Sequence, residues 1–184
     1  MGIRSIFGRN AAVRREIERS RVDLYRMARA WCRDADLAED VAHTAIEKAL
    51  RGASQLRDAA RLRAWLFRIL ANTLRDHARA QREFIPLDGM EETILDNGPT
   101  PEEAHASAEL TRRVRRAVGE LPLGQRQVVT LVDLEGCSYT EVGEILDIPA
   151  GTVMSRLCRA RRALRERLKQ GASELLGTRL RSVK

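Results

Sequence analysis

Aromatic residues and long apolar runs are both scarce in this sequence of 184 residues. Phe, Trp and Tyr make up 4% of the chain, and the abundant Ala, Leu, Arg and Glu favour helices over sheets. No run approaches the roughly 20 apolar residues that a helix needs to span a bilayer. The first residues, Met1 to Arg4, also lack the apolar core of a secretory signal. We therefore expect an all-α protein located in the cytoplasm, without membrane insertion.

Cysteine is scarce as well, and the few cysteines are poorly placed for a zinc site or for disulfide bonds. The three cysteines, Cys32, Cys137 and Cys158, stand far apart and form no CxxC pair. This pattern indicates neither a zinc site nor a disulfide framework. We expect ordinary reduced thiols.

Clusters of metal-ligating or catalytic residues are also missing. His43 and Glu47 lie four residues apart and could share a helical face, but no third or fourth metal ligand stands nearby. Asp76 and His77 are adjacent, which on a helix splays the two side chains about 100° apart. They are therefore poorly placed to act as an acid and base pair. We expect no metal, no cofactor and no enzymatic activity.

Acidic residues are outnumbered by basic ones. The chain has 33 Lys and Arg against 26 Asp and Glu, which gives a net charge of +7. Clustered cations gain affinity for phosphates by releasing counterions, so this excess favours a polyanionic partner. Nucleic acid is the favoured partner, and an anionic membrane surface is the alternative.

Glycine and proline are almost absent from residues 11–82. In this range apolar residues recur at helical spacing, for example at Leu24, Met27, Ala28 and Trp31. The pattern predicts one helical unit in the first half of the chain.

The composition changes abruptly in residues 86–108. Proline and glycine appear there repeatedly, and every charged side chain in the segment is acidic. Helical periodicity resumes with Leu110, breaks at Leu121 and Pro122, and then continues. We predict two small helical domains, 1–85 and 109–184, joined by a flexible linker at 86–108.

A helix-turn-helix is predicted in the C-terminal domain. Ser138 and Glu141 have the spacing of a capping box, so a short helix should begin near Tyr139. The run from Asp147 to Pro149 then interrupts this helix, and proline suits the first turn of the next one. Two helices joined by a tight turn result.

The second helix of this pair has two distinct faces. On a 3.6-residue wheel, Val153, Leu157 and Ala160 fall on one side, followed by Leu164 and Leu168. The opposite side carries polar and basic residues that are free to contact a partner. A recognition helix needs this arrangement, because its first turns enter the major groove. A solvated basic helix is the alternative, but the capped helix and the turn before it favour DNA reading.

The motifs around this helix pair resemble a known family. They are Leu121-Pro122, the run from Asp133 to Val142 and the run from Ile148 to Arg161, which together are similar to the region-four domain of extracytoplasmic-function (ECF) sigma factors. The resemblance implies a domain that reads the −35 promoter element. Two positions depart from the family, since Met154 stands where Lys or Arg is common and Asp147 where Gly is common. The expected −35 contacts are Met154, Ser155, Arg156, Cys158, Arg159 and Arg162.

The N-terminal domain resembles region two of the same family. Asp36 to Val41 is similar to the start of its polymerase-binding helix, and Asp36 with Glu39 also has capping-box spacing. The resemblance implies docking on the clamp coiled coil of the largest subunit of RNA polymerase. His43 and Thr44 stand where relatives carry Gln followed by Glu or Asp, so the polar contacts should differ. The expected polymerase-binding residues are Asp36, Glu39, Asp40, His43, Thr44 and Glu47.

The segment from Trp65 to Asn72 resembles the −10 segment of the family. Its apolar residues are too closely spaced to share one stripe, so we expect most to be in the core and some to face a second surface. Arginines surround them, and basic groups beside aromatic ones are typical of surfaces that bind single-stranded DNA. The loop from Leu56 to Arg61, which in the family holds a flipped base, lacks the usual Gly and Ser here. The expected −10 contacts are Arg57, Arg61, Arg68, Asn72, Arg75 and Arg79.

These resemblances together imply a sigma factor that binds core RNA polymerase and promoter DNA and directs promoter melting. They also imply an anti-sigma partner. Two alternatives remain, a conventional helix-turn-helix regulator and a sigma-like decoy that only binds an anti-sigma protein. The regulator would have unrelated sequence before the linker, and the decoy would lose the arginines of both DNA-binding segments.

Overall fold

The protein is helical throughout the ranges that its structure describes. This computed structural model describes residues 3–56, 58–84 and 102–181, with side chains placed at 10–56, 58–80 and 111–169. No strand occurs in these ranges, so the predicted all-α class is confirmed. None of the described helices is both long and apolar enough to cross a membrane.

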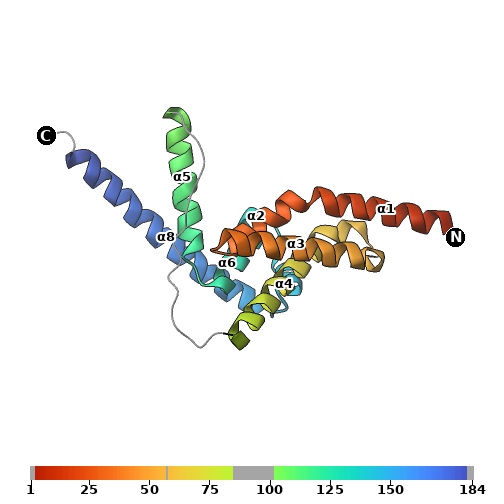
Figure 1. Ribbon diagram of the computed structural model, residues 1–184. Helices are drawn as coiled ribbons and strands as arrows, with labels where there is room; N and C mark the ends of the chain where they lie inside the picture. The colour runs from red at the N-terminus through yellow and green to blue at the C-terminus, as the bar shows by residue number, and fades with distance from the viewer. Residues whose placement is uncertain (1–2, 57, 85–101, 182–184) are drawn as a thin grey trace.

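The N-terminal unit is a small helical bundle in which α3 packs between α2 and α4 (Figure 1). The apolar stripe predicted from the sequence forms its core, since Leu24, Met27, Ala28 and Trp31 are all buried. The elements of this unit are α1 (Ile3–Arg19), α2 (Arg21–Trp31), α3 (Ala35–Gly52), the short 3₁₀ helices η1 (Ala53–Gln55) and η2 (Ala59–Arg61), and α4 (Leu62–Phe84).

The C-terminal unit is organised around its last helix, which packs against the three other α-helices of the unit. Beyond this packed region, α5 and α8 diverge in Figure 1. The elements of this unit are α5 (Glu102–Gly119), α6 (Leu123–Val129), the π-helical η3 (Thr130–Leu134), α7 (Tyr139–Leu146) and α8 (Ala150–Arg181).

The start of α3 differs from the prediction. Asp34, and not Asp36, is the N-cap residue, and its side chain accepts a hydrogen bond from the Leu37 amide at 2.7 Å. The predicted capping box of Asp36 with Glu39 is therefore wrong. Asp34 has extended backbone angles, as a cap requires, whereas Asp36 lies inside the first helical turn, where its charge still favours the helix dipole.

The second unit has longer helices at both ends than the sequence pattern indicated. Helix α5 begins at Glu102, inside the predicted linker, and α8 continues to Arg181. The predicted break at Leu121 and Pro122 is confirmed, because Pro122 is the N-cap of α6.

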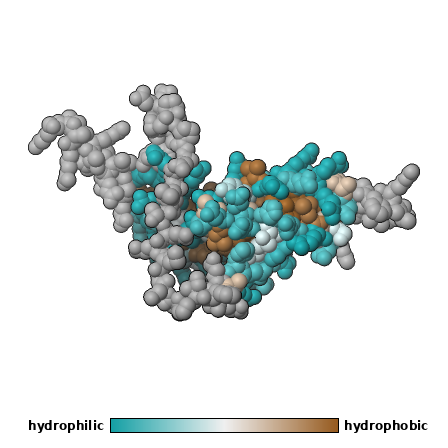
Figure 2. All heavy atoms as spheres, viewed as in Figure 1, coloured by the Kyte–Doolittle hydropathy of each residue, from teal (hydrophilic) through white to brown (hydrophobic). Residues whose placement is uncertain are grey.

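The two units share one continuous hydrophobic core. Buried residues from α1 to α4 and from α6 to α8 form a single cluster, with α4 packed against α7 and α2 against α6. Among the residues coloured in Figure 2, hydrophilic ones cover most of the face in view, and hydrophobic ones gather in patches between them. The described parts of the units are therefore packed together in the free chain.

Candidate nucleic-acid interface

The turn between α7 and α8 is built from local sequence signals. Ser138 Oγ accepts from the Glu141 amide at 3.2 Å, and Glu141 accepts in return from the Ser138 amide at 2.8 Å. The predicted capping box is confirmed. The turn itself needs two special positions. Asp147 adopts a left-handed backbone with φ of 57°, and a Cβ on Gly143 would lie only 2.9 Å from the Ile148 carbonyl oxygen.

The two predicted faces of α8 are present in its first turns. Val153, Leu157 and Ala160 are buried in the core. On the opposite side Met154 is 52% exposed, and Cys158, Arg159 and Arg162 are also exposed. The exposed face is thus available to a partner along at least two helical turns.

Two of the six expected −35 residues lie apart from this face. Ser155 and Arg156 are half-buried. The Ser155 hydroxyl donates to the Thr152 carbonyl at 3.1 Å. Arg156 lies over α6, where a Cβ on Gly124 would come within 2.9 Å of its Nη1 atom. The sequence pattern did not separate these two side chains from their exposed neighbours.

Arg161 is held by a carboxylate. Its guanidinium donates to both oxygens of Asp133, with distances of 3.1 Å from Nε and 2.5 Å from Nη2. This hydrogen-bonded pair raises the pKa of Arg161. The contact fixes α8 against the end of η3, and it occupies the guanidinium of Arg161, whereas Arg159 and Arg162 extend the exposed face.

The −10 segment lies on α4. Phe67 and Leu70 are buried, while Trp65 and Ile69 are half-buried, so most of the segment belongs to the core as predicted. The ring of Phe67 also lies 5.5 Å from the guanidinium carbon of Arg63. The segment thus combines apolar packing with a cationic outer surface.

The expected −10 contacts occupy different positions on this surface. Asn72 is half-buried, and its Oδ1 accepts a hydrogen bond from Arg75 Nη1 at 2.9 Å. Arg61, Arg68 and Arg79 are exposed. The expected contact Arg57 lies outside the described residues.

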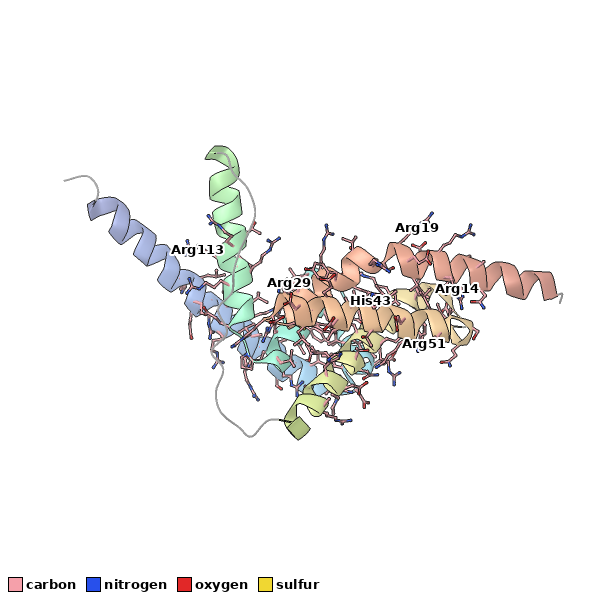
Figure 3. The ribbon with its side chains drawn as sticks, viewed as in Figure 1. Arg14, Arg19, Arg29, His43, Arg51 and Arg113 are labelled. Carbon is pink, nitrogen blue, oxygen red and sulfur yellow. The ribbon has the colours of Figure 1, made fainter. Side chains whose placement is uncertain are left out.

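The expected polymerase-binding residues share the outer face of α3. Thr44 is half-buried, and the five others are exposed. His43 Nε2 lies 3.2 Å from Glu47 Oε1, and Glu47 also pairs with Arg51 at 3.0 Å. Figure 3 shows His43 and Arg51 on the same helix, so this exposed face carries both signs of charge.

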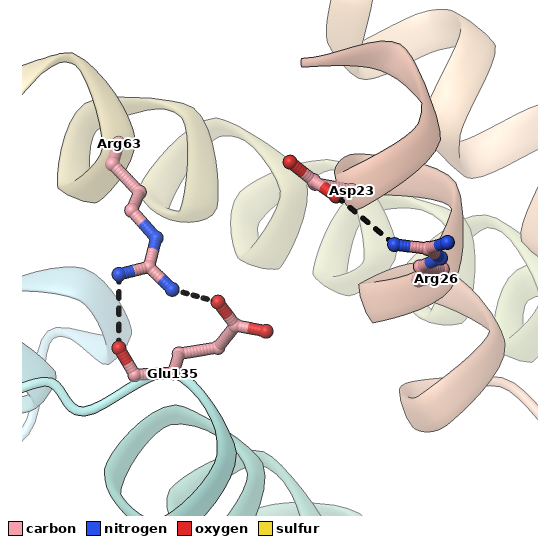
Figure 4. A network of polar contacts seen from close by, with 4 residues as sticks. All are labelled: Asp23, Arg26, Arg63 and Glu135. Carbon is pink, nitrogen blue, oxygen red and sulfur yellow. Dashed lines mark hydrogen bonds and ion pairs between the residues drawn. The ribbon is translucent and has the colours of Figure 1, made fainter.

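Arginines of the N-terminal unit donate to carbonyl groups at helix ends in the C-terminal unit. Arg33 Nε donates to the carbonyl of Gly119 at 3.3 Å, at the end of α5. Arg75 Nη2 donates to that of Leu146 at 2.9 Å, at the end of α7. Arg63 donates to the Glu135 carbonyl at 2.9 Å and pairs with its carboxylate (Figure 4). Helix C-termini carry partial negative charge, so each contact is favourable.

A buried polar contact lies at the centre of the same interface. Trp31 Nε1 donates to Thr130 Oγ1 at 2.8 Å, and both residues are buried. Thr130 in turn donates to the carbonyls of Arg126 and Gln127 in the preceding helix, α6. Nearby, Nε and Nη1 of buried Arg126 have no partner among the described residues, and burial lowers the pKa of this arginine. The hydrogen bonds across this interface join residues 71 to 99 positions apart, so no local sequence pattern could reveal them.

The helix-turn-helix and the separate basic helical segment define a helical DNA-binding protein. Comparisons with known proteins support this class. The family described as Sigma-70 region 2 matches residues 17–84, and the one described as Sigma-70, region 4 matches residues 111–164.

The chain is also similar to whole proteins. It is 36% identical over 134 residues to the ECF RNA polymerase sigma-E factor of Escherichia coli K12, covering 68% of this chain and 70% of the relative. The factor of the same description from Haemophilus influenzae is 35% identical over 138 residues, with 70% and 73% covered.

Two solved structures have a similar fold. The sigma factor RpoE, solved in complex with the anti-sigma factor NepR from Bartonella quintana, has a TM-score of 0.66 and 25% identity, covering 84% of this chain and 95% of that one. CnrH, solved in complex with the cytosolic domain of CnrY, has a TM-score of 0.60 and 26% identity, covering 91% and 94%. The chain therefore belongs to the ECF sigma factors of the sigma-70 family, and it functions as an RNA polymerase sigma factor.

Proposed function

We propose that three exposed faces of this chain divide the work of promoter recognition. The outer face of α3 binds core RNA polymerase, the exposed face of α8 reads the −35 duplex, and α4 with the preceding loop captures the melted −10 strand. The observation that carries this proposal is the exposed face of α8, where Arg159 and Arg162 lie opposite a fully buried stripe.

The −35 assignment depends on how a helix-turn-helix meets DNA. The second helix places its first turns in the major groove, where arginines reach guanine edges and phosphates. Met154, Cys158, Arg159 and Arg162 have the required exposure. We assign these four to the groove, and we assign the half-buried Ser155 and Arg156 to supporting positions near the DNA backbone.

The −10 assignment depends on cationic groups beside a polar side chain. Arg61 and Arg68 are exposed and can follow a phosphate backbone, while Asn72 supplies an amide that can contact a base. In the structure Asn72 and Arg75 are bonded to one another, and Arg75 also bonds to Leu146. A DNA strand that binds these atoms must therefore exchange with those contacts.

The remaining assignments concern partners and boundaries. The two structural relatives were each solved with a protein partner, described for RpoE as an anti-sigma factor. We propose an anti-sigma partner for this chain and a location in the cytoplasm, where core polymerase acts. We further propose that residues 1–85 and 109–184 are its functional domains, with the second extended by the start of α5 at Glu102.

Binding to core polymerase tests the proposed division most simply. We expect the double variant Asp40→Arg with His43→Glu to bind core polymerase about tenfold more weakly or worse, a change of about 1.4 kcal/mol. Both side chains are exposed, so the fold should be unaffected. Affinity is measured with labelled full-length protein, and Glu18→Arg on α1 is the matched control. Unchanged affinity of the double variant would move the docking surface elsewhere.

A further inference from the structure

The exposed face of α8 contains an apolar hollow. Met154 is 52% exposed and Tyr139, at the start of α7, is 41% exposed. Together with Leu157 and Cys158 they line a hollow of about 440 Å³. Two exposed apolar side chains and a thiol thus meet beside a basic surface, and the hollow between them has room for a small apolar group of a ligand.

The rim of the hollow is cationic. Arg161, Arg162 and Arg165 line its other side. The pair with Asp133 holds Arg161, whereas Arg162 and Arg165 are exposed side chains. The occupant that best matches this lining carries a small apolar group close to negative charge. A helical peptide without acidic residues lacks the negative charge.

Duplex DNA offers one such group. The C5-methyl of thymine is the apolar feature of the major-groove edge, and phosphates flank it on both sides. Guanine, adenine and cytosine present only hydrogen-bonding groups there. Methionine suits contact with a methyl group because its thioether is flexible and polarizable.

We propose that Met154 and Cys158 read the C5-methyl group of a thymine in the −35 duplex, while the arginines of the rim hold the adjacent phosphates. This inference rests on the proposed reading of the −35 element by α8. It makes one base of the target depend on apolar contact, where an arginine at position 154 would instead read guanine by hydrogen bonds.

Deletion of a single methyl group tests this proposal. A promoter duplex is first selected from a randomised pool by core polymerase carrying the full chain. Each −35 thymine is then replaced singly by deoxyuridine, which lacks only the methyl. We expect one or two positions at which binding weakens about fourfold, the value of one buried methyl group.

Variants connect the methyl effect to the hollow. Met154→Ala should bind thymine and deoxyuridine equally at the sensitive position, and Met154→Leu should keep the preference. Met154→Lys should lose the preference and steepen the salt dependence by about one counterion. Val22→Ala, a change at an exposed apolar residue of α2, is the matched control and should keep the wild-type ratio.

The outcomes separate this inference from the function on which it rests. If Arg159→Ala and Arg162→Ala leave promoter affinity unchanged, α8 does not read the −35 element and both proposals fall. If those variants weaken binding but no deoxyuridine position has an effect, only methyl reading is overturned. Retention of the methyl preference by Met154→Ala would also overturn it.

Discussion

Cys32 is a buried thiol at the end of α2, and its titration links stability to pH. Burial raises the pKa of this thiol to about 11, from about 9 for the ordinary group. Between these values the unfolded chain releases the proton and the native chain keeps it. The native state then binds more protons, so the stability contributed by Cys32 falls as the pH rises from about 9 to about 11.

The pH dependence of unfolding checks this effect. We expect Cys32→Ala to lose less stability than the wild type between about pH 9 and about pH 11, because the titrating group is absent. Urea unfolding across this range measures the difference. Cys158→Ala, at an exposed position, is the control and should follow the wild type. Equal slopes for Cys32→Ala and the wild type would show that this thiol does not titrate abnormally.

At the scale of elements, the helix-turn-helix depends on the close approach of two backbones. A Cβ on Gly143 would lie 2.9 Å from the Ile148 carbonyl, an atom that cannot move without shifting the turn. A Cβ on Gly151 in α8 would have no neighbouring atom of the described residues within 4 Å. Both glycines are helical, but only Gly151 has room for a Cβ atom.

Alanine substitution should change the stability of the protein in opposite directions at these two glycines. We expect Gly143→Ala to destabilise the protein by about 1 to 3 kcal/mol through overpacking. Gly151→Ala should stabilise it by about 0.5 to 1 kcal/mol, since alanine favours a helix and the site has room. Urea unfolding measures both, and the second variant is the matched control for the first. A Gly143→Ala protein as stable as the wild type would mean that the turn is looser than the structure shows.

The elements that could be predicted from the sequence are those that local signals determine. The capping box of Ser138 and Glu141 and the turn ending at Pro149 lie within a few residues of their partners, so their spacing alone fixes the helix ends. The N-cap of α3 was missed because Asp34 and Asp36 are both good caps, and only the chain entering the helix selects between them. The π-helical η3 was missed because this helix type has no residue pattern of its own.

The candidate site could also be predicted only where local sequence signals determine it. The helical periodicity of the apolar residues was enough to predict the buried stripe of α8 and its exposed face. It could not show that Arg156 lies over Gly124 or that Arg161 pairs with Asp133, because both depend on neighbours that the chain brings close only on folding. Exposure of Met154 could be predicted, but the hollow around it needs Tyr139 from another helix.

At the scale of the whole molecule, the contact between the two units combines favourable and unfavourable parts. Apolar burial, the Trp31 bond to Thr130 and the arginine contacts to helix ends stabilise it. The two unpartnered nitrogen atoms of buried Arg126 oppose it. Arg75 contributes to this contact, so the DNA binding that we propose at Arg75 would compete with the packing of the units for the same group.

A double-mutant cycle measures the central contact of this interface. We expect Thr130→Val to cost about 1 to 3 kcal/mol, since it leaves the buried Trp31 N–H without an acceptor. In a Trp31→Phe background the same change should cost less, because no donor remains to be orphaned. Urea unfolding of the four proteins gives the coupling. An equal cost in both backgrounds would show that the bond does not contribute to packing.

In the mechanism that we propose, α4 captures a melted −10 strand while α8 holds the −35 duplex. Asn72→Ala, in polymerase carrying the full chain, tests it most directly. Permanganate footprinting reports the melted bubble, and a gel shift reports the closed complex. We expect Asn72→Ala to lower open-complex formation more than closed-complex binding, and we expect Arg159→Ala to lower both, because the −35 contacts precede melting. If Asn72→Ala lowers both equally, or lowers neither, strand capture by α4 is contradicted.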